Sequence, residues 1–298
     1  MKFRFQPASD KIFIFAIYAV LWFALIIVSY PLLYVISASF TVPSAVISGN
    51  VSIIPLQPTL IAYKAVFASE MLMIGFRNSF IYTSIGTALS VMITMIAAYP
   101  LSRKDLAGRN IFMFLFTFTM MFSGGLMPTY LVVRSLKLIN TPLALIIPGS
   151  LSVYLLILTR TYLRTTIPEE LIEATQIDGC SDFRFFSALT LPLSKPIIAV
   201  IALMYAVGKW NSYFDALIYL NDPKMFPLQI VLRNILVMNT QDPQMKGAID
   251  VTVEMNSMYL SRLLRYSTIV VASVPVMLIY PFAQKYFIRG IMIGSIKG

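Results

Sequence analysis

Long apolar runs constrain this chain more than any other feature of its sequence. The first run begins at Ile12 and ends near Phe40, and three basic residues, Lys2, Arg4 and Lys11, precede it. The hydrocarbon core of a bilayer is about 30 Å thick, and about 20 helical residues cross it. The run is too long for a signal peptide and lacks the small-residue cleavage site of one, so we expect it to be retained as a membrane-spanning helix.

The composition also points to a membrane protein. Of the 298 residues, 58% are hydrophobic and 12% are charged. Soluble proteins carry about 25% charged residues, and a soluble core of this size could not hide so much apolar surface. The sequence therefore predicts an all-α integral membrane protein.

Five further apolar runs follow the first, and together they predict six transmembrane helices. The third starts at Ile111 and is interrupted by Ser-Gly-Gly at 123–125 and by Pro128. The fifth is strictly apolar only before Lys209, so it must continue through polar residues to Leu220 to reach full length. We expect the other three at 80–101, at 143–163 and at 267–288, the last with Pro275 and Pro281 inside it.

The distribution of basic residues predicts the orientation of the chain. The short loop 102–110 holds Arg103, Lys104 and Arg109, whereas the segment 41–76 holds a single lysine. Short loops rich in Lys and Arg lie on the cytoplasmic side of a membrane. We therefore expect the N-terminus, the loop 102–110, the segment 164–195 and the C-terminal tail to be cytoplasmic.

The chain lacks the residues of several kinds of enzymatic site. It contains no histidine, one cysteine (Cys180) and no GxxxxGK[ST] phosphate loop. These absences exclude an intrachain disulfide, zinc-hydrolase motifs, Ser-His-Asp triads and nucleotide hydrolysis through a phosphate loop. The net charge of +10 does not indicate nucleic-acid binding, because the basic residues flank apolar segments and do not alternate with stacking aromatics. We expect no catalytic site, no metal site and no nucleic-acid partner, but extensive contact with membrane lipid.

An acidic segment interrupts this apolar chain. Residues 169–183 hold five of the thirteen acidic residues. Pro168 and the two glutamates that follow it suit the first turn of a helix, and Gly179 suits a left-handed stop. Ser181 suits the cap of a second short helix, and two prolines bound the return to the membrane. The pattern by itself is equally typical of a solvated connector between two spans.

The spacing within this segment distinguishes it from a simple connector. The stretch EATQIDGCSDFRFFSALTLPLSKP resembles the EAA loop of binding-protein-dependent ABC importer permeases, in which EAA is followed after two residues by DG and later by LP and a second proline. Thr175 replaces the second alanine, and Cys180 follows the glycine in place of alanine; both are small and preserve close packing. The matching residues are Glu173, Ala174, Asp178, Gly179, Leu191, Pro192 and Pro196.

Further motifs extend the resemblance over roughly 75–298. AAYPLSRKDLAGR is similar to the exit of the second span in carbohydrate-type permeases, and GGLMPTYLVVRSLKLINT and GKWNSYFDALIYLND are similar to the branch that serves complex oligosaccharides. The closing YFIRGIMIGSIKG resembles the tail of maltose-permease-like subunits. The resemblance implies a type I ABC importer permease fold: an N-terminal segment, first helix and extracytoplasmic loop over 1–74, a core over 75–290 with a coupling loop at 168–196, and a tail over 291–298.

The resemblance also implies a function and a set of partners. The chain would be a permease subunit that moves oligosaccharides across the bacterial cytoplasmic membrane. It would hold no cofactor itself, and it would pair with a homologous second permease, an extracytoplasmic sugar-binding protein and two ATPase subunits that bind ATP and Mg. The EAA loop would dock on one ATPase through Glu170, Glu173, Ala174, Asp178, Gly179 and Pro192. The final residues Ser295, Lys297 and Gly298 would also reach the ATPase.

The outer half of the fifth span offers a candidate for contact with sugar. In a continuous helix, Asn211 and Asp215 would share one face, beside Trp210 and Phe214. Polar planar groups next to aromatic rings suit sugars, and polar residues inside a membrane often line a pathway. The alternative is an aromatic belt at the outer interface, with Lys209 extended toward water. We expect the substrate path to be lined by Trp210, Asn211, Tyr213 and Asp215.

Two other functions also fit a chain with several membrane spans. A secondary transporter would work without ATPase partners, but the chain shows no convincing internal repeat and no paired acidic residues at mid-membrane. A membrane-bound sensor or scaffold would need no pathway lined for sugar. Transport activity and the presence of an ATPase partner separate these functions.

Overall fold

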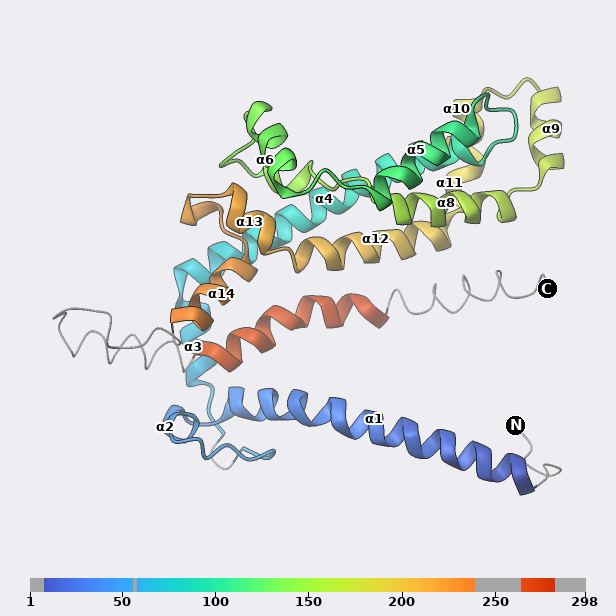
Figure 1. Ribbon diagram of the computed structural model, residues 1–298. Coiled ribbons are helices and arrows are strands. Elements are labelled where there is room, and N and C mark those ends of the chain that lie inside the picture. The colour runs from blue at the N-terminus through green and yellow to red at the C-terminus, as the bar shows by residue number, and fades with distance from the viewer. Residues whose placement is uncertain (1–7, 56–57, 239–263, 282–298) are drawn as a thin grey trace. The chain divides into compact units, whose positions relative to one another are not determined.

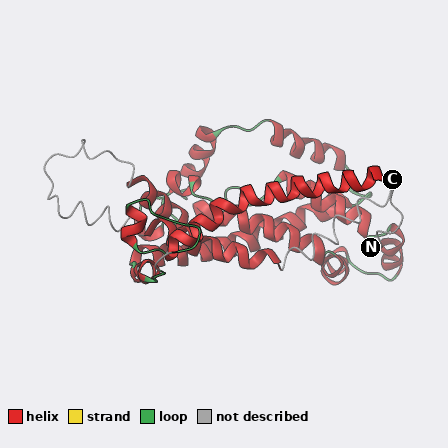
Figure 2. Ribbon diagram, turned by 90° about the horizontal axis from the view of Figure 1, so that it is seen from below, coloured by secondary structure: helices red, strands yellow, loops and turns green. Residues whose placement is uncertain are grey.

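The computed structural model describes residues 8–55, 58–238 and 264–281. The regular elements in these ranges are helices joined by loops (Figure 2), and an isolated antiparallel bridge pairs Thr41 with Pro58. The predicted all-α class is confirmed. The chain divides into two compact units, one of Met1–Ser69 with Leu232–Ala272 and one of Glu70–Val231 with Ser273–Gly298.

The first unit is built on one long apolar helix, α1 (Ala8–Phe40), which is followed by α2 (Pro43–Ile47) and α3 (Ile61–Ala68). Residues 10–40 are long and apolar enough to cross a membrane, and none of the most apolar stretch is buried within the protein. Such a helix is suited to lipid on all sides. At its end, Ser39 Oγ lies 2.8 Å from the hydroxyl of Tyr63, which fastens α3 to α1. The predicted long apolar helix over 12–40 is confirmed.

The second unit is organised around α4 (Glu70–Ser102), which packs along α12 (Lys195–Trp210) and α8 (Val153–Thr166) (Figure 1). Apolar side chains from all three helices form its core, among them Met95, Leu156 and Ile201. The remaining elements are α5 (Arg109–Met121), α6 (Leu126–Ser135), α7 (Leu143–Ile146), α9 (Glu169–Ile177), α10 (Asp182–Phe185), the π-helical turn η1 (Phe186–Thr190), α11 (Leu191–Leu193), α13 (Phe214–Tyr219), the 3₁₀ turn η2 (Pro223–Met225) and α14 (Leu228–Met238).

A buried polar contact joins the three central helices. The Tyr205 hydroxyl lies 2.8 Å from Thr94 Oγ1, and it accepts a hydrogen bond from the Ser152 N–H at 3.0 Å. Tyr205 comes from α12, Thr94 from α4, and Ser152 precedes α8. Because a buried hydroxyl without a partner would be costly, this contact fixes the register of the three helices.

Judged by length and composition, the described helices supply fewer membrane spans than the six predicted. Three helices could each cross a membrane: Asp10–Phe40, Glu70–Ser102 and Leu264–Pro281. Two bent pairs would raise the number to five if each were one span: α5 with α6, bent by 113°, and 182–193 with α12, bent by 78°. The 14 residues of α8 measure about 21 Å, which is less than a bilayer core. Six spans remain a prediction.

Several predicted span boundaries differ from the observed helices. The second span begins at Glu70, ten residues before the expected start at 80, and the third breaks after Met121 where interruption was expected. The fourth is split into α7 and α8 by a turn in which Gly149 has φ +67°. The last begins at Leu264 and is described to Pro281; the rest of the predicted run lies outside the described residues.

The fifth span does not continue to Leu220 as predicted. α12 ends at Trp210, and α13 begins at Phe214 after a short non-helical segment. The sequence of this segment explains the break. Ser212 Oγ donates a hydrogen bond to Asp215 Oδ2 at 3.0 Å, and side chains of this kind compete locally with the helical backbone and favour helix ends.

Candidate coupling surface and solute cavity

The acidic segment folds into a short exposed helix. α9 starts directly after Pro168, and Glu169 and Glu170 occupy its first turn, where carboxylates interact favourably with the positive end of the helix dipole. α9 has no buried residue. The predicted coupling residues Glu170, Glu173, Ala174, Asp178 and Gly179 are all exposed.

Gly179 ends this helix in the left-handed conformation, as predicted. Its φ is +68°. The Cys180 N–H donates to the Thr175 carbonyl at 2.9 Å, and the Gly179 N–H donates to the Gln176 carbonyl at 3.0 Å. These are the two hydrogen bonds of a Schellman motif, which satisfies carbonyls at the end of a helix. An L-residue adopts this φ at a cost of about 1–2 kcal/mol, so the turn favours glycine.

Two apolar side chains flank the turn and were not singled out by the sequence analysis. Ile177 is 87% exposed and Phe183 is 78% exposed, the highest values among the large hydrophobic side chains of the described residues. Asp178 and Asp182 lie next to them in the chain, so the acyl region of a membrane is an unsuitable environment for this turn. The turn is therefore a candidate interaction surface.

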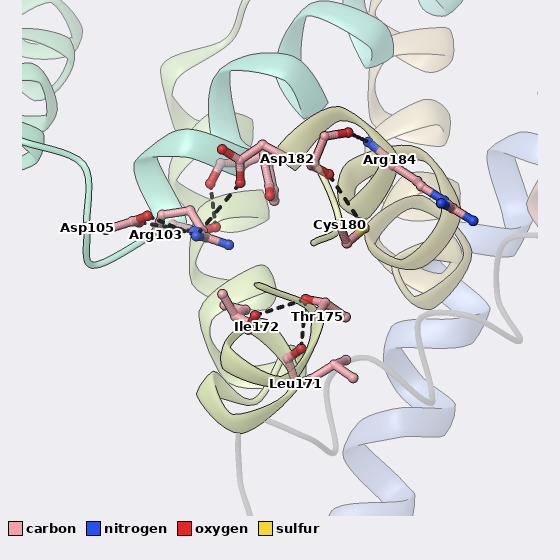
Figure 3. A network of polar contacts seen from close by, with 11 residues as sticks. Arg103, Asp105, Leu171, Ile172, Thr175, Cys180, Asp182 and Arg184 are labelled. Carbon is pink, nitrogen blue, oxygen red and sulfur yellow. Dashed lines mark hydrogen bonds and ion pairs between the residues drawn. The ribbon is translucent and has the colours of Figure 1, made fainter. Parts of the chain in front are cut away.

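The second helix of the insert is held by an arginine from the segment that joins α4 to α5 (Figure 3). Arg103 Nε and Nη2 donate to Asp105 Oδ1 and Oδ2 at 3.0 and 2.9 Å. Nη2 lies 3.9 Å from Asp182 Oδ1, and the guanidinium lies 6.0 Å from the centroid of the Phe185 ring. The Arg103 side chain is only 8% exposed. The end of α4 is thereby attached to α10.

The next residue attaches the first helix of the insert. Lys104 forms an ion pair with Glu169, 65 positions away in the sequence, at the start of α9. Sequence analysis assigned Arg103 and Lys104 only to the positive charge of a cytoplasmic loop. Asp182 and Glu169 are distant from them in the sequence, so nothing in the local pattern could identify these two contacts.

The Arg103–Asp105 contact sets the charge state of both groups. Hydrogen bonds from Arg103 hold the pKa of the Asp105 carboxyl below its usual 3.8, and the same contact raises the pKa of the guanidinium. Both groups are therefore charged at neutral pH. Because the Asp105 side chain is 64% exposed, solvent screens the pair, and its contribution to stability is small.

Prolines mark the corner where the insert meets α12. Pro192 is exposed in α11, and Pro196 lies in the first turn of α12, where a missing N–H is tolerated. The segment 182–193 is bent by 78° relative to α12. The two predicted prolines therefore lie at the bend between the insert and α12, and the return to the membrane there stays a prediction.

The second unit also contains a polar cavity of about 350 Å³. It lies beside α4, α12 and the start of α8, close to the break between α12 and α13. Its lining carries hydroxyl groups, three tyrosine rings and two charged side chains. The polar residues are Ser79, Tyr82, Ser152, Tyr154, Tyr205, Lys209, Ser212 and Asp215.

The break after α12 separates the four residues predicted to line a substrate path. Asp215 lines the cavity. Trp210 is buried, with its ring edge-on to Phe76 at 5.6 Å between centroids. Tyr213 is 46% exposed, and Asn211 Nδ2 donates to a carbonyl of its own helix at 2.9 Å. The prediction that Asn211 and Asp215 share one helical face is wrong, because the backbone between them is not helical.

The predicted contacts of the C-terminal tail fall in a part of the chain for which the structure gives no description. Ser295, Lys297 and Gly298 lie outside the described residues. Their role in contacting an ATPase stays a prediction.

Apolar helices, a polar cavity beside them and an exposed insert attached to the end of a long helix together define a subunit of a membrane transporter. Residues 90–293 match the family described as the inner membrane component of binding-protein-dependent transport systems. The chain belongs to this family. It is a permease subunit of an ABC importer and resides in the bacterial inner membrane.

Individual relatives agree with this assignment over nearly the whole chain. The polygalacturonan/rhamnogalacturonan transport system permease protein YtcP of Bacillus subtilis is 41% identical and aligns with 97% of this chain and 100% of its own length. Protein LplC of the same organism is 40% identical over 90% of this chain and 89% of its own. The crystal structure of a bacterial ABC transporter involved in the import of the acidic polysaccharide alginate is similar with a TM-score of 0.85, at 29% identity, over 95% of this chain and 99% of that chain.

Proposed function

We propose that this chain carries oligosaccharides across the membrane and that its 168–196 segment couples their movement to ATP hydrolysis in a partner ATPase. The observation that carries the proposal is the exposed helix–turn–helix insert, whose two helices are attached to the end of α4 by Arg103 and Lys104. An exposed surface whose helices contact the end of a membrane helix can pass a partner's movement into the membrane.

The insert has the chemistry of a docking surface. Its turn presents the apolar side chains of Ile177 and Phe183, and the carboxylates of Glu170, Glu173 and Asp178 are exposed on the same short segment. An apolar centre with a charged rim is the usual anatomy of a protein interface. The acidic rim selects a partner surface that carries Lys or Arg, since complementary charge speeds and orients association.

The other partners follow from the same function. A homologous second permease would complete the pathway, and an extracytoplasmic sugar-binding protein would deliver the substrate. ATP and Mg would bind in two ATPase subunits, since this chain has no phosphate loop. The tail at 291–298 would add a second contact with an ATPase, and 1–74 would supply an N-terminal cytoplasmic segment, a first transmembrane helix and an extracytoplasmic loop ahead of the 75–290 core.

The substrate class is supported by the relatives and by the cavity. The names of YtcP and of the alginate importer refer to polysaccharides. Hydroxyl-bearing serines and tyrosine rings line the cavity, and a site with aromatic faces and a few placed polar groups suits a small solute such as a short sugar.

The docking surface can be tested by co-purification of the ATPase with the tagged permease. We expect Ile177→Asp with Phe183→Asp to abolish co-purification and sugar uptake while the permease still reaches the membrane. Ile54→Asp is a matched control, because Ile54 is 75% exposed but lies on the predicted outer side. Retention of the ATPase by the double variant would refute the docking surface. A complex that assembles but imports no oligosaccharide would refute the substrate class.

A further inference from the structure

The last turn of α12 brings a lysine ammonium into the polar cavity. Lys209 Nζ donates hydrogen bonds to the carbonyls of Ile146 at 3.2 Å and Leu145 at 3.4 Å, at the end of α7. Among the described residues, Lys209 forms no ion pair with a carboxylate. Asp215 lines the same cavity and accepts its hydrogen bond from Ser212.

α4 has no side chain at the point where the Lys209 side chain lies against it. Gly86 faces the lysine stem, and a Cβ atom built there would lie 2.5 Å from Lys209 Cδ and 2.8 Å from Cε. Atoms do not approach this closely without a bond, so a side chain at position 86 would push the stem out of its path. The absence of a side chain at Gly86 is therefore part of what positions the ammonium.

An ammonium at this place is costly unless something balances its charge. Charged side chains among membrane helices are expensive, and they usually pair with an opposite charge or face a pathway. The two carbonyls offer only partial negative charge, and the Asp215 carboxylate acts on the ammonium electrostatically without forming an ion pair with it. An ammonium has three N–H donors. The two carbonyls accept two of them, and the third is available to a group in the cavity. If Lys209 only capped the carbonyls of α7, an uncharged amide could do the same.

We propose that Lys209 binds the carboxylate of a sugar acid, so that this importer takes uronate-containing oligosaccharides. The inference rests on the proposed function, in which the cavity is part of the sugar pathway. A hexuronate ring carries its carboxylate on one side and free hydroxyls on the other. Lys209 pairs with the carboxylate in a charge-assisted hydrogen bond, and Asp215, which accepts hydrogen bonds, faces the hydroxyls. Tyr154, 54% exposed and lining the cavity, offers an aromatic ring face.

The inference is tested with the complete complex in vesicles of zwitterionic lipid, which supply no anionic headgroup. Uptake of trigalacturonate and of a neutral trisaccharide that the same binding protein loads is measured for the wild type and for Lys209→Gln. For each sugar, uptake by the variant is divided by uptake by the wild type, which removes any preference of the binding protein for one of the two sugars. Lys224→Gln is the control, because it removes the same charge from an exposed position.

We expect Lys209→Gln to lower uptake of trigalacturonate roughly 10- to 100-fold, the usual effect of losing one hydrogen bond to a charged group, and to leave uptake of the neutral sugar near the wild-type level. Gly86→Leu is expected to act in the same direction, and Lys224→Gln to change neither sugar. Equal losses for both sugars would show that Lys209 only supports the fold and would overturn the inference, as would unchanged uptake of trigalacturonate. A wild-type complex that imports the neutral sugar but not trigalacturonate also overturns it and leaves the proposed function standing. If the wild type imports no sugar, the proposed function itself has failed.

Discussion

Replacing Gly179 by valine tests whether the insert must hold one rigid shape. A Cβ atom at this position would meet no atom within 4 Å, so the substitution causes no clash. The expected damage comes from the backbone alone, because φ is +68° and a β-branched side chain disfavours positive φ more than alanine does. The effect should therefore be confined to the turn, and the membrane helices should assemble normally.

The expected size of this effect follows from the cost of the left-handed conformation. For an ordinary L-residue this cost is about 1–2 kcal/mol, and each 1.4 kcal/mol changes an equilibrium about tenfold. The population with the native turn should fall by roughly 10-fold or more relative to other turn shapes. Asparagine tolerates this region, so uptake should decrease in the order wild type, Gly179→Asn, Gly179→Ala, Gly179→Val.

The assay combines sugar uptake per assembled complex with the amount of ATPase that co-purifies. Gly49→Val serves as a control, because Gly49 also has a positive φ, +76°, and a Cβ there also meets no atom within 4 Å, but it lies on the predicted outer side. If Gly179→Val imports sugar as well as the wild type, the turn is not a coupling element. If asparagine is as harmful as valine, the damage does not come from φ and the reasoning above is wrong.

Three further experiments address the charge, the topology and the cavity. Because the folded pKa of Asp105 is lowered from 3.8, its contact with Arg103 contributes fully above that value and is lost as pH falls through the lowered pKa. The hydrogen-exchange protection factors of the 169–185 amides, in which the intrinsic pH dependence of exchange is divided out, should therefore be constant from about pH 7 to 5 and should fall only in stronger acid; a fall near neutral pH would contradict this. Single cysteines at Ser102 and Asn221 in a cysteine-free background should label from opposite sides of the membrane, and labelling from one side would refute the span count. Asp215→Ala should lower the apparent affinity for sugar several-fold to about 100-fold. Asn211→Ala should have little effect, because the Asn211 amide already bonds its own helix; equal effects of the two variants would contradict the placement of the cavity.

Local features of the fold were predictable from the sequence, and contacts between distant segments were not. The first span, the left-handed Gly179 and the Ser181 cap, whose Oγ accepts from the Arg184 N–H at 3.4 Å, depend on residues a few positions apart. The break after Trp210 was not predicted, because the length of helix needed to cross a membrane was given more weight than local hydrogen bonding by the polar side chains after Trp210. The Lys104–Glu169 pair joins residues 65 positions apart, and only the tertiary fold brings them together.

The insert lies at one end of α4 and α12, and the cavity lies further along the same two helices, which favours transmission by a rigid body. α4 carries Arg103 just beyond its end and Gly86 about 26 Å away along its axis, at 1.5 Å per residue. α12 starts at the corner of the insert, and Lys209 lies 14 residues after its first residue, Lys195, about 21 Å along its axis. The buried contact between Thr94 and Tyr205 and the interlocked core around it oppose sliding of one helix along the other, since close-packed interiors do not deform smoothly. A shift applied at the insert should therefore move both helices together and reach Lys209 undiminished. The non-helical segment 211–213 is then the place where the shift is absorbed, and Asp215, on the far side of that break, is the part of the cavity whose distance from Lys209 changes.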